Sequence, residues 1–212
     1  MSKTYSRTIR RKTVKRAKSY LSKKLFYIIA SILMIISVVL SIYFVSSGEA
    51  HIQRSLHPMA YSEIVEREAQ NYGIDPLLVY SVMKAESNFE SDAISGAGAM
   101  GLMQIMPETY EWLAMRAGAT KVAKEDLLNP EINIKYGCLF LSHLMKKYPQ
   151  LKSVLAAYNA GPGNVDSWLN DSTITPDGEN LEYIPFPETK KYTEKVLNHY
   201  KIYQRIYEIT NS

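Results

Sequence analysis

Residues 85–107 read AESNFESDAISGAGAMGLMQIMP, and the interpretation of the chain depends most on this stretch. It begins with Glu86 at the end of an apolar segment, where a charged side chain is costly unless it has a role. A glycine-rich run follows and closes on an apolar string that contains Gln104. A second block, residues 156–165, reads AAYNAGPGNV and also ends an apolar segment with polar side chains. These two blocks carry the candidate functional residues.

Charge is distributed unevenly along the 212 residues. The first 48 residues hold ten of the 25 Lys and Arg and none of the 21 Asp and Glu, so residues 49–212 carry six more acids than bases. A nucleic-acid-binding domain would instead show a basic folded part. We therefore expect no nucleic acid partner, and we interpret the basic tail, residues 1–24, as a topology signal.

Residues 25–45 form an uncharged, mostly apolar run of 21 residues. A helix of this length spans the roughly 30 Å hydrocarbon core of a bilayer. A cleaved signal peptide is the alternative, but the run is long for one and no clear Ala-x-Ala site follows. Because the basic residues come first, we expect a single-pass transmembrane helix in the cell membrane. Its N-terminus would be cytoplasmic and the rest of the chain extracytoplasmic.

Turn and cap signals divide the remainder of the chain. Residues 46–60 are predicted to be a short linker, and helical spacing of apolar residues dominates 61–209. Asp75-Pro76 and Asn129-Pro130 each place an N-cap residue before a proline at the first helical position. We expect a compact, mostly α domain with at most a small hairpin in 91–105. Its helices are predicted near 61–72, 76–88, 107–118, 130–147, 151–159, 165–169 and 188–209.

Glu86 lies on the apolar face of its predicted helix, because Val79, Met83 and Glu86 follow helical spacing. Burial and the negative end of the helix dipole both raise the pKa of a carboxyl in this position. A carboxyl that stays protonated near neutral pH can act as a general acid. A glutamate that simply turns into solvent is the plainer interpretation of this helix on its own.

The polar residues of both blocks lie where the backbone can approach a ligand. Gly96, Gly98 and Gly101 allow a tight loop to fold back on the preceding helix. The amide of Gln104, inside an apolar string, needs either buried partners or a ligand. The Gly-Pro-Gly turn at 161–163 exposes the end of a helix that carries Tyr158 and Asn159.

With these residues in view, the chain resembles the soluble lytic transglycosylase (SLT) family of peptidoglycan-cleaving enzymes. The resemblance covers about residues 60–207 and implies a goose-type-lysozyme-like fold. The family motifs occur in order, and a family serine and a family methionine also match. The matching residues are Glu86-Ser87, Ser95, Gly101-Leu102-Met103-Gln104, Met106, Ala157-Tyr158-Asn159 and Tyr192.

The resemblance implies cleavage of the β-1,4 bond between N-acetylmuramic acid and N-acetylglucosamine. Glu86 would protonate the glycosidic oxygen and then accept a proton from the muramic acid 6-hydroxyl, which closes a 1,6-anhydro ring. Such chemistry needs one carboxylate, whereas glycosidases that use water employ two. The resemblance also implies a set of substrate-binding residues: Ser95, Met103, Gln104, Met106, Tyr158, Asn159 and Tyr192.

Other candidate chemistry is less well supported. Glu90 and Asp92 are possible second carboxylates, but their polar surroundings favour solvated loop acids; either one across the cleft would make hydrolysis plausible. The glycines at 96–101 follow a helix rather than a strand, so they do not indicate nucleotide binding. The four histidines lack ligand spacing, and Cys138 lies in an apolar run. We therefore expect no metal, no cofactor and an inert, buried thiol.

Tyrosines recur at helical spacing along the last predicted helix. Aromatic faces suit sugar rings, but a stripe that packs on the helical core explains Tyr200, Tyr203 and Tyr207 more simply. Only Tyr192 is implied to close over the site.

The leading hypothesis is a membrane-anchored lytic transglycosylase that acts on peptidoglycan glycan strands. A hydrolytic muramidase of the same fold is the first alternative. The second is a non-catalytic peptidoglycan-binding or scaffold domain in an export or conjugation assembly. Whichever hypothesis holds, cell-wall or secretion machinery is a candidate partner besides the glycan strands and the membrane. The chemistry of the released products distinguishes these hypotheses.

Overall fold

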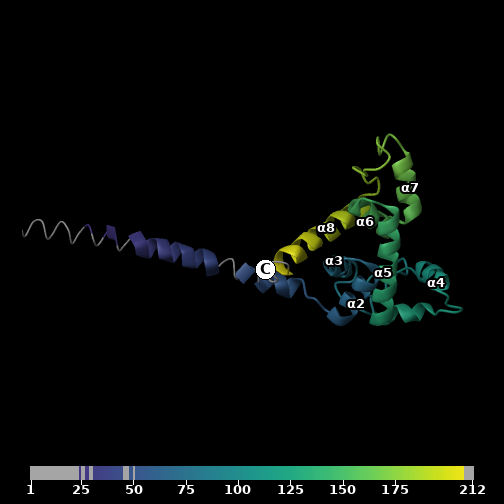
Figure 1. The fold of residues 1–212 in the computed structure, drawn as a ribbon, viewed down its shortest axis with the longest axis horizontal. Helices are drawn as coiled ribbons and strands as arrows, with labels where there is room; N and C mark the ends of the chain where they lie inside the picture. Colours follow the sequence, from purple (N-terminus) through teal and green to yellow (C-terminus); the bar gives the residue numbers. More distant parts are fainter. Residues whose placement is uncertain (1–23, 25–26, 29–30, 45–47, 50, 208–212) are drawn as a thin grey trace, which may run out of the picture. The chain divides into compact units, whose positions relative to one another are not determined.

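The computed structural model describes residues 24, 27–28, 31–44, 48–49 and 51–207 (Figure 1). The chain divides into two units, Met1–Ile52 and Gln53–Ser212. In the first unit, residues 31–44 are helical and their large apolar side chains are exposed. No helix within the described ranges combines the length and hydropathy needed to cross a bilayer. The predicted tail 1–24, apart from Lys24, and parts of the predicted membrane segment 25–45 lie outside the described residues.

The second unit is helical, which confirms the predicted mostly α class. The 3-10 helix η1 was not predicted, and α7 is longer than the helix predicted near 165–169. Between α3 and α4, the described chain forms two isolated bridges, Ile94 with Met100 and Met100 with Ile105, and no strand. The elements are α2 (Ser62–Tyr72), α3 (Pro76–Glu86), α4 (Pro107–Arg116), η1 (Lys124–Leu128), α5 (Pro130–Lys147), α6 (Leu151–Ala160), α7 (Pro162–Asn170) and α8 (Pro187–Tyr207).

Local cap chemistry sets where the main helices begin. The Asp75 carboxylate accepts a hydrogen bond from the Leu77 N–H at 2.8 Å, at the start of α3. The Asn129 amide oxygen accepts one from the Glu131 N–H at 2.9 Å, at the start of α5. Both helices have proline at the first turn, where a missing N–H costs nothing. These caps confirm the helix starts predicted from the sequence.

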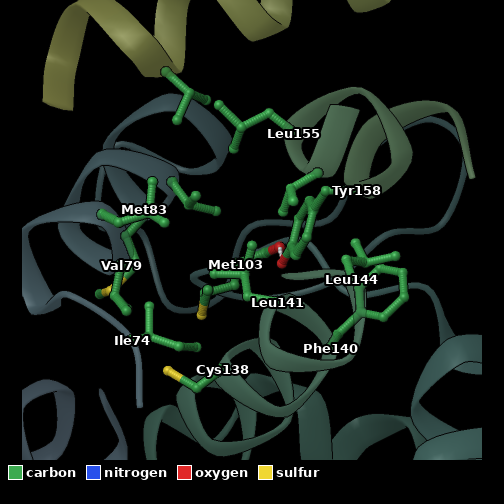
Figure 2. Packing of buried hydrophobic residues seen from close by; sticks show 14 of the residues in the cluster. Ile74, Val79, Met83, Met103, Cys138, Phe140, Leu141, Leu144, Leu155 and Tyr158 are labelled. Carbon is green, nitrogen blue, oxygen red and sulfur yellow. Dashed lines mark hydrogen bonds between the residues drawn. The ribbon is translucent and has the colours of Figure 1, made fainter. Parts of the chain in front are cut away.

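The core forms around α5, which packs against α2, α4, η1 and α6, while α8 packs against α3 and α6. Figure 2 shows side chains of α3, α5 and α6 gathered around Met103, which comes from the loop between α3 and α4. Met83, Met103, Leu141 and Leu155 are all fully buried. The loop that follows Glu86 is therefore held by the core and does not lie free on the surface.

Residues 53–60, which we call the strap, pack against the end of α8. The His57 side chain is buried, and its Nε2 lies 3.0 Å from His199 Nδ1. The Tyr203 hydroxyl donates to the Pro58 carbonyl at 2.9 Å, and the Tyr207 hydroxyl donates to the His57 carbonyl at 2.8 Å. The second half of the predicted linker 46–60 therefore belongs to the folded unit, because side chains of α8 satisfy its backbone.

Candidate active site

Glu86 is the last residue of α3, which ends two residues before its predicted end. The helix stops because Asn88 and Phe89 have φ values of +52° and +70°. Left-handed backbone cannot continue a right-handed helix. Lys84 Nζ donates to the Asn88 amide oxygen at 2.5 Å and fastens this reversal. The chain turns away at once, and the Glu86 side chain stays at the carboxyl-terminal end of α3.

Ser87 ties the end of α3 to the glycine-rich loop. Its buried hydroxyl donates to the Leu102 carbonyl at 2.8 Å, across fifteen residues of chain. The same oxygen accepts from the Phe89 N–H at 3.1 Å. One side chain therefore fixes both the reversal after Glu86 and the position of the Gly-Leu-Met-Gln segment beside it.

The Glu86 carboxyl has a pKa raised to about 7, and burial is the main cause. The Tyr192 hydroxyl and the Lys195 cation, both on α8, act in the opposite direction and lower this pKa. A neighbouring carboxylate would raise it further, but none of the described acids acts on it. The group can therefore hold or release a proton near neutral pH without a second acid beside it.

Two tyrosines lie near this carboxyl. The charge of Glu86 contributes, after burial, to raising the pKa values of both Tyr158 and Tyr192. The Tyr158 hydroxyl donates to the Met103 carbonyl at 2.8 Å, as Figure 2 shows. The Tyr192 hydroxyl is buried and makes no hydrogen bond of normal geometry with any described residue. Tyr158 thus holds the loop in place, while the Tyr192 hydroxyl remains available to interact with the Glu86 carboxyl or a ligand.

The glycine-rich loop is closed by its own polar side chains. The Ser95 hydroxyl accepts from the Ala99 N–H at 3.0 Å. The Gln104 amide nitrogen donates to the carbonyls of Ala93 and Gly101 at 3.0 and 2.9 Å. We expected Ser95 and Gln104 to bind substrate; the hydrogen bonds that the structure gives them hold the loop.

A buried asparagine, Asn133 of α5, anchors the same loop. Its amide nitrogen donates to the carbonyls of Met100 and Leu127, both at 2.8 Å, and its oxygen accepts from the Met103 N–H at 2.7 Å. Gly101 has a φ of +75°, and a Cβ there would meet Leu127 O at 2.2 Å. Glycine is therefore required at this point for the loop to approach η1 and α5 so closely.

Met103, Met106 and Asn159 differ in their surroundings. The Met103 side chain is fully buried against Gly137, so in this conformation it contributes to the site through its backbone. Met106 is partly exposed at the start of α4. The Asn159 side chain is exposed at the end of α6, and its oxygen accepts from the Thr189 hydroxyl at 2.8 Å.

The remaining candidate groups lie apart from this chemistry. Glu90 and Asp92 are exposed, in agreement with their interpretation as solvated loop acids. Cys138 is fully buried, and burial raises the pKa of its thiol, so it is an inert core residue. In the ranges that the structure describes, no group of three or more His, Cys, Asp or Glu side chains is arranged to hold a metal ion.

Sequence reasoning missed Lys195 and Asn133. Lys195 Nζ donates to the Ala85 carbonyl at 2.6 Å, across 110 residues of chain. Its only sequence signal is a position one helical turn after Tyr192. Asn133 stands between two isoleucines near the start of an apolar helix, and a buried amide in such a setting needs partners. That signal was present in the sequence but did not say which backbone groups the amide would bind.

The chain is similar to known lytic murein transglycosylases. The soluble lytic murein transglycosylase of Escherichia coli is 34% identical over 153 residues, which cover 71% of this chain and 24% of that protein. The membrane-bound lytic murein transglycosylase C of Edwardsiella ictaluri is 29% identical over 178 residues, 74% of this chain and 49% of that one. The chain thus spans between about a quarter and a half of the length of these relatives.

The solved structures similar to this chain are also lytic transglycosylases. An inactive mutant of the lytic transglycosylase Slt from Pseudomonas aeruginosa superposes with a TM-score of 0.63 at 36% identity, covering 70% of this chain and 24% of that one. The 70 kDa soluble lytic transglycosylase of Escherichia coli gives a TM-score of 0.66 at 30% identity, covering 72% and 25%. The family model named transglycosylase SLT domain matches residues 63–180, more than half of the chain. The chain therefore belongs to the transglycosylase SLT domain family.

Proposed function

We propose that this chain is a peptidoglycan lytic transglycosylase that cleaves the β-1,4 bond between N-acetylmuramic acid and N-acetylglucosamine and forms 1,6-anhydromuramic acid. The observation that carries the proposal is the Glu86 carboxyl at the end of α3, with a pKa raised to about 7 and no other carboxylate of the described residues acting on it. Hydrolytic glycosidases place a second carboxylate across the bond, either to activate water or to form a covalent intermediate. A single acid suits a reaction whose nucleophile is the substrate's own hydroxyl.

In the proposed first step, the protonated Glu86 carboxyl gives its proton to the glycosidic oxygen as the bond to C1 of muramic acid breaks. The ionised carboxylate then takes the proton of the 6-hydroxyl, whose oxygen attacks C1 and closes the anhydro ring. Glu86 ends protonated, ready for the next turnover. A pKa near the working pH suits a group that must both donate and accept a proton.

The activities named for the relatives support this proposal. Curated relatives along 71 to 74% of the chain are soluble and membrane-bound lytic murein transglycosylases. One structural neighbour is an inactive mutant in which glutamine replaces a glutamate. A glutamate essential for activity in that protein fits the role proposed for Glu86.

The test is the release of soluble glycan from isolated cell wall by the full chain and by Glu86→Gln. We expect this variant to lose at least ~100-fold in rate, since that is the usual contribution of a general acid, while its circular dichroism stays helical. Glu90→Gln, an exposed acid four residues later, is the matched control and should keep full activity. Retained activity in Glu86→Gln, or equal loss in Glu90→Gln, would contradict the proposal.

We further propose that residues 25–45 anchor the enzyme in the cell membrane, with a cytoplasmic N-terminus. The support is the uncharged run preceded by ten basic residues and the exposed apolar side chains of the helix at 31–44. Ser2→Cys and His51→Cys would test this with a membrane-impermeant maleimide on cells whose outer barrier is permeabilised. Buried Cys138 gives little background. Labelling should reach position 51 and spare position 2; the reverse pattern would contradict the topology.

A further inference from the structure

One face of α8 runs past both blocks of the site. Thr189, Tyr192 and Lys195 are spaced by three residues and so lie along one side of the helix. In order, they reach the Asn159 side chain, the surroundings of the Glu86 carboxyl and the Ala85 carbonyl. Lys195 therefore links α8 by a hydrogen bond to Ala85, the residue that immediately precedes Glu86.

The ammonium of Lys195 acts at the carboxyl-terminal end of α3 in two ways. It donates to the Ala85 carbonyl at 2.6 Å, one of the last carbonyls of a helix that lack intrahelical partners. It also places a positive charge near the Glu86 carboxyl. This charge lowers the pKa of Glu86, whereas burial raises it. A cation at a helix carboxyl terminus is favourable in its own right.

The other groups around this charge are few. Tyr192 from α8 and Tyr158 from α6 face the Glu86 carboxyl. Lys84 of α3 and His199 of α8 lie close enough for the Lys195 charge to lower their pKa values. Of the charged side chains on the described residues, Lys195 is the one whose charge acts on Glu86.

We infer that Lys195 is a positioning residue for Glu86, because its ammonium binds the Ala85 carbonyl, holds the last turn of α3 and places a positive charge beside the adjacent carboxyl. Burial alone would keep the acid protonated and make it a poor base for the second step. The nearby cation restores access to the ionised form. This inference rests on the proposed function for its meaning, but the balance itself can be measured without turnover.

A plain helix cap is the competing explanation. A cap would stabilise α3 and, when removed, would lower activity by the same factor at every pH. A charge that balances Glu86 would instead change the pH at which the carboxyl titrates. Lys195→Gln separates the two, because its amide can still donate a hydrogen bond but carries no charge.

The experiment is a titration of the Glu86 carboxyl by NMR in the full chain, solubilised in detergent and labelled with carbon-13 glutamate. Glu86→Gln assigns the signal by its loss. In Lys195→Gln and Lys195→Met we expect the titration midpoint to rise by about 0.5–1 unit, less than for a buried ion pair because Lys195 is exposed. Lys195→Arg and Lys201→Met, an exposed lysine later on α8, should titrate like the wild type.

Salt and kinetics supply two further readouts. The difference between Lys195→Gln and the wild type should shrink as ionic strength rises toward ~1 M, where charges more than about 3 Å apart are screened. The alkaline limb of the pH–rate profile on cell wall should move upward with the midpoint. An unchanged midpoint in both neutral variants, or an equal shift in Lys201→Met, would overturn the inference. If the wild type releases no glycan, the proposed function fails, while the titration still decides the role of Lys195.

Discussion

The two ends of α8 use similar side chains in different ways. Near its start, the buried Tyr192 hydroxyl interacts with the Glu86 carboxyl but makes no hydrogen bond of normal geometry with any described residue. Near its end, Tyr203 and Tyr207 donate their hydroxyls to carbonyls of the strap at 2.9 and 2.8 Å. The rings of Tyr203 and Tyr207 also stack, with centroids 5.8 Å apart. The start of α8 thus contributes to the candidate active site, and its end packs against the strap, residues 53–60.

The difference lies in what each buried tyrosine hydroxyl interacts with. Buried hydroxyls in folded proteins are nearly always paired, so an unpaired one calls for an explanation. At the strap end, the hydroxyls of Tyr203 and Tyr207 both donate hydrogen bonds, so these two residues hold the strap against α8. At the site end, the Tyr192 hydroxyl lacks a hydrogen bond of normal geometry and burial raises the pKa of Glu86, so both groups carry a local cost in stability. Such local costs are typical of functional sites.

The largest effect that tests the comparison is removal of the strap. A chain that begins at residue 61 loses its contacts from Arg54, His57 and Pro58 to α8, whereas a chain that begins at Gln53 keeps them. We expect the shorter chain to have a free energy of unfolding about 2–4 kcal/mol lower, at roughly 1 kcal/mol for each hydrogen bond. Urea denaturation measures this difference, and equal stability of the two chains would show that the strap is only a linker.

A sharper test substitutes one tyrosine at each end. Tyr203→Phe leaves the Pro58 carbonyl without its partner and should cost about 1–2 kcal/mol of stability. Its activity on cell wall should be unchanged. Tyr192→Phe removes a hydroxyl that interacts with Glu86 without a hydrogen bond of normal geometry, so it should cost less stability than Tyr203→Phe. The alkaline limb of its pH–rate profile should move to higher pH, because this hydroxyl lowers the pKa of Glu86. Two results would contradict the proposed difference between the two ends of α8. One is an equal loss of stability in Tyr192→Phe and Tyr203→Phe, and the other is an unchanged pH–rate profile in both variants.

The smallest expected effects are on the pH dependence of stability, which should have opposite signs for Glu86, near the start of α8, and His199, near the strap. The pKa of Glu86 is raised from 4.5 to about 7, so its contribution to stability is complete below 4.5 and is lost as pH rises through 7. The pKa of His199 is lowered from 6.5 to about 4, chiefly by burial and then by His57, so its contribution is complete above 6.5 and is lost as pH falls through 4.

Two variants separate the contributions of Glu86 and His199 to the pH dependence of stability. Glu86→Gln should gain stability relative to the wild type as pH rises from about 4.5 to 7, and His199→Gln should gain as pH falls from about 6.5 to 4. Each change should be roughly 1 kcal/mol, because both groups keep some contact with solvent. Denaturation curves at several pH values provide the measurement. Parallel curves for a variant and the wild type would rule out that group as the source of the slope.

The helical class and most helix starts could be predicted because they depend on local chemistry. Asp75 and Asn129 make the cap hydrogen bonds that their sequence signals promise. Glu86 likewise ends a helix whose spacing could be read from neighbouring residues. The end of α3 was less predictable, because the left-handed Asn88 and Phe89 are held by Ser87 and Lys84 together with the distant Leu102.

Features that depend on distant partners could not be predicted. The strap looked like a linker because His57 finds its partner 142 residues later, in His199. Lys195 lies 110 residues after Ala85, and only the packing of α8 brings its ammonium to the Ala85 carbonyl. Met103 was expected at the substrate, but the missing side chain at Gly137 makes the space that buries it. In each case, the deciding contact joins segments that only the fold brings together.

The most direct test of the account is mass spectrometry of the muropeptides that the full chain releases from isolated cell wall. If Glu86 acts alone and the muramic acid 6-hydroxyl is the nucleophile, the products are one water lighter than hydrolysis products and have no reducible end. Products with a reducing end would contradict the account, because they require a second group that activates water. Wall binding without any release would contradict it as well and would favour a peptidoglycan-binding role.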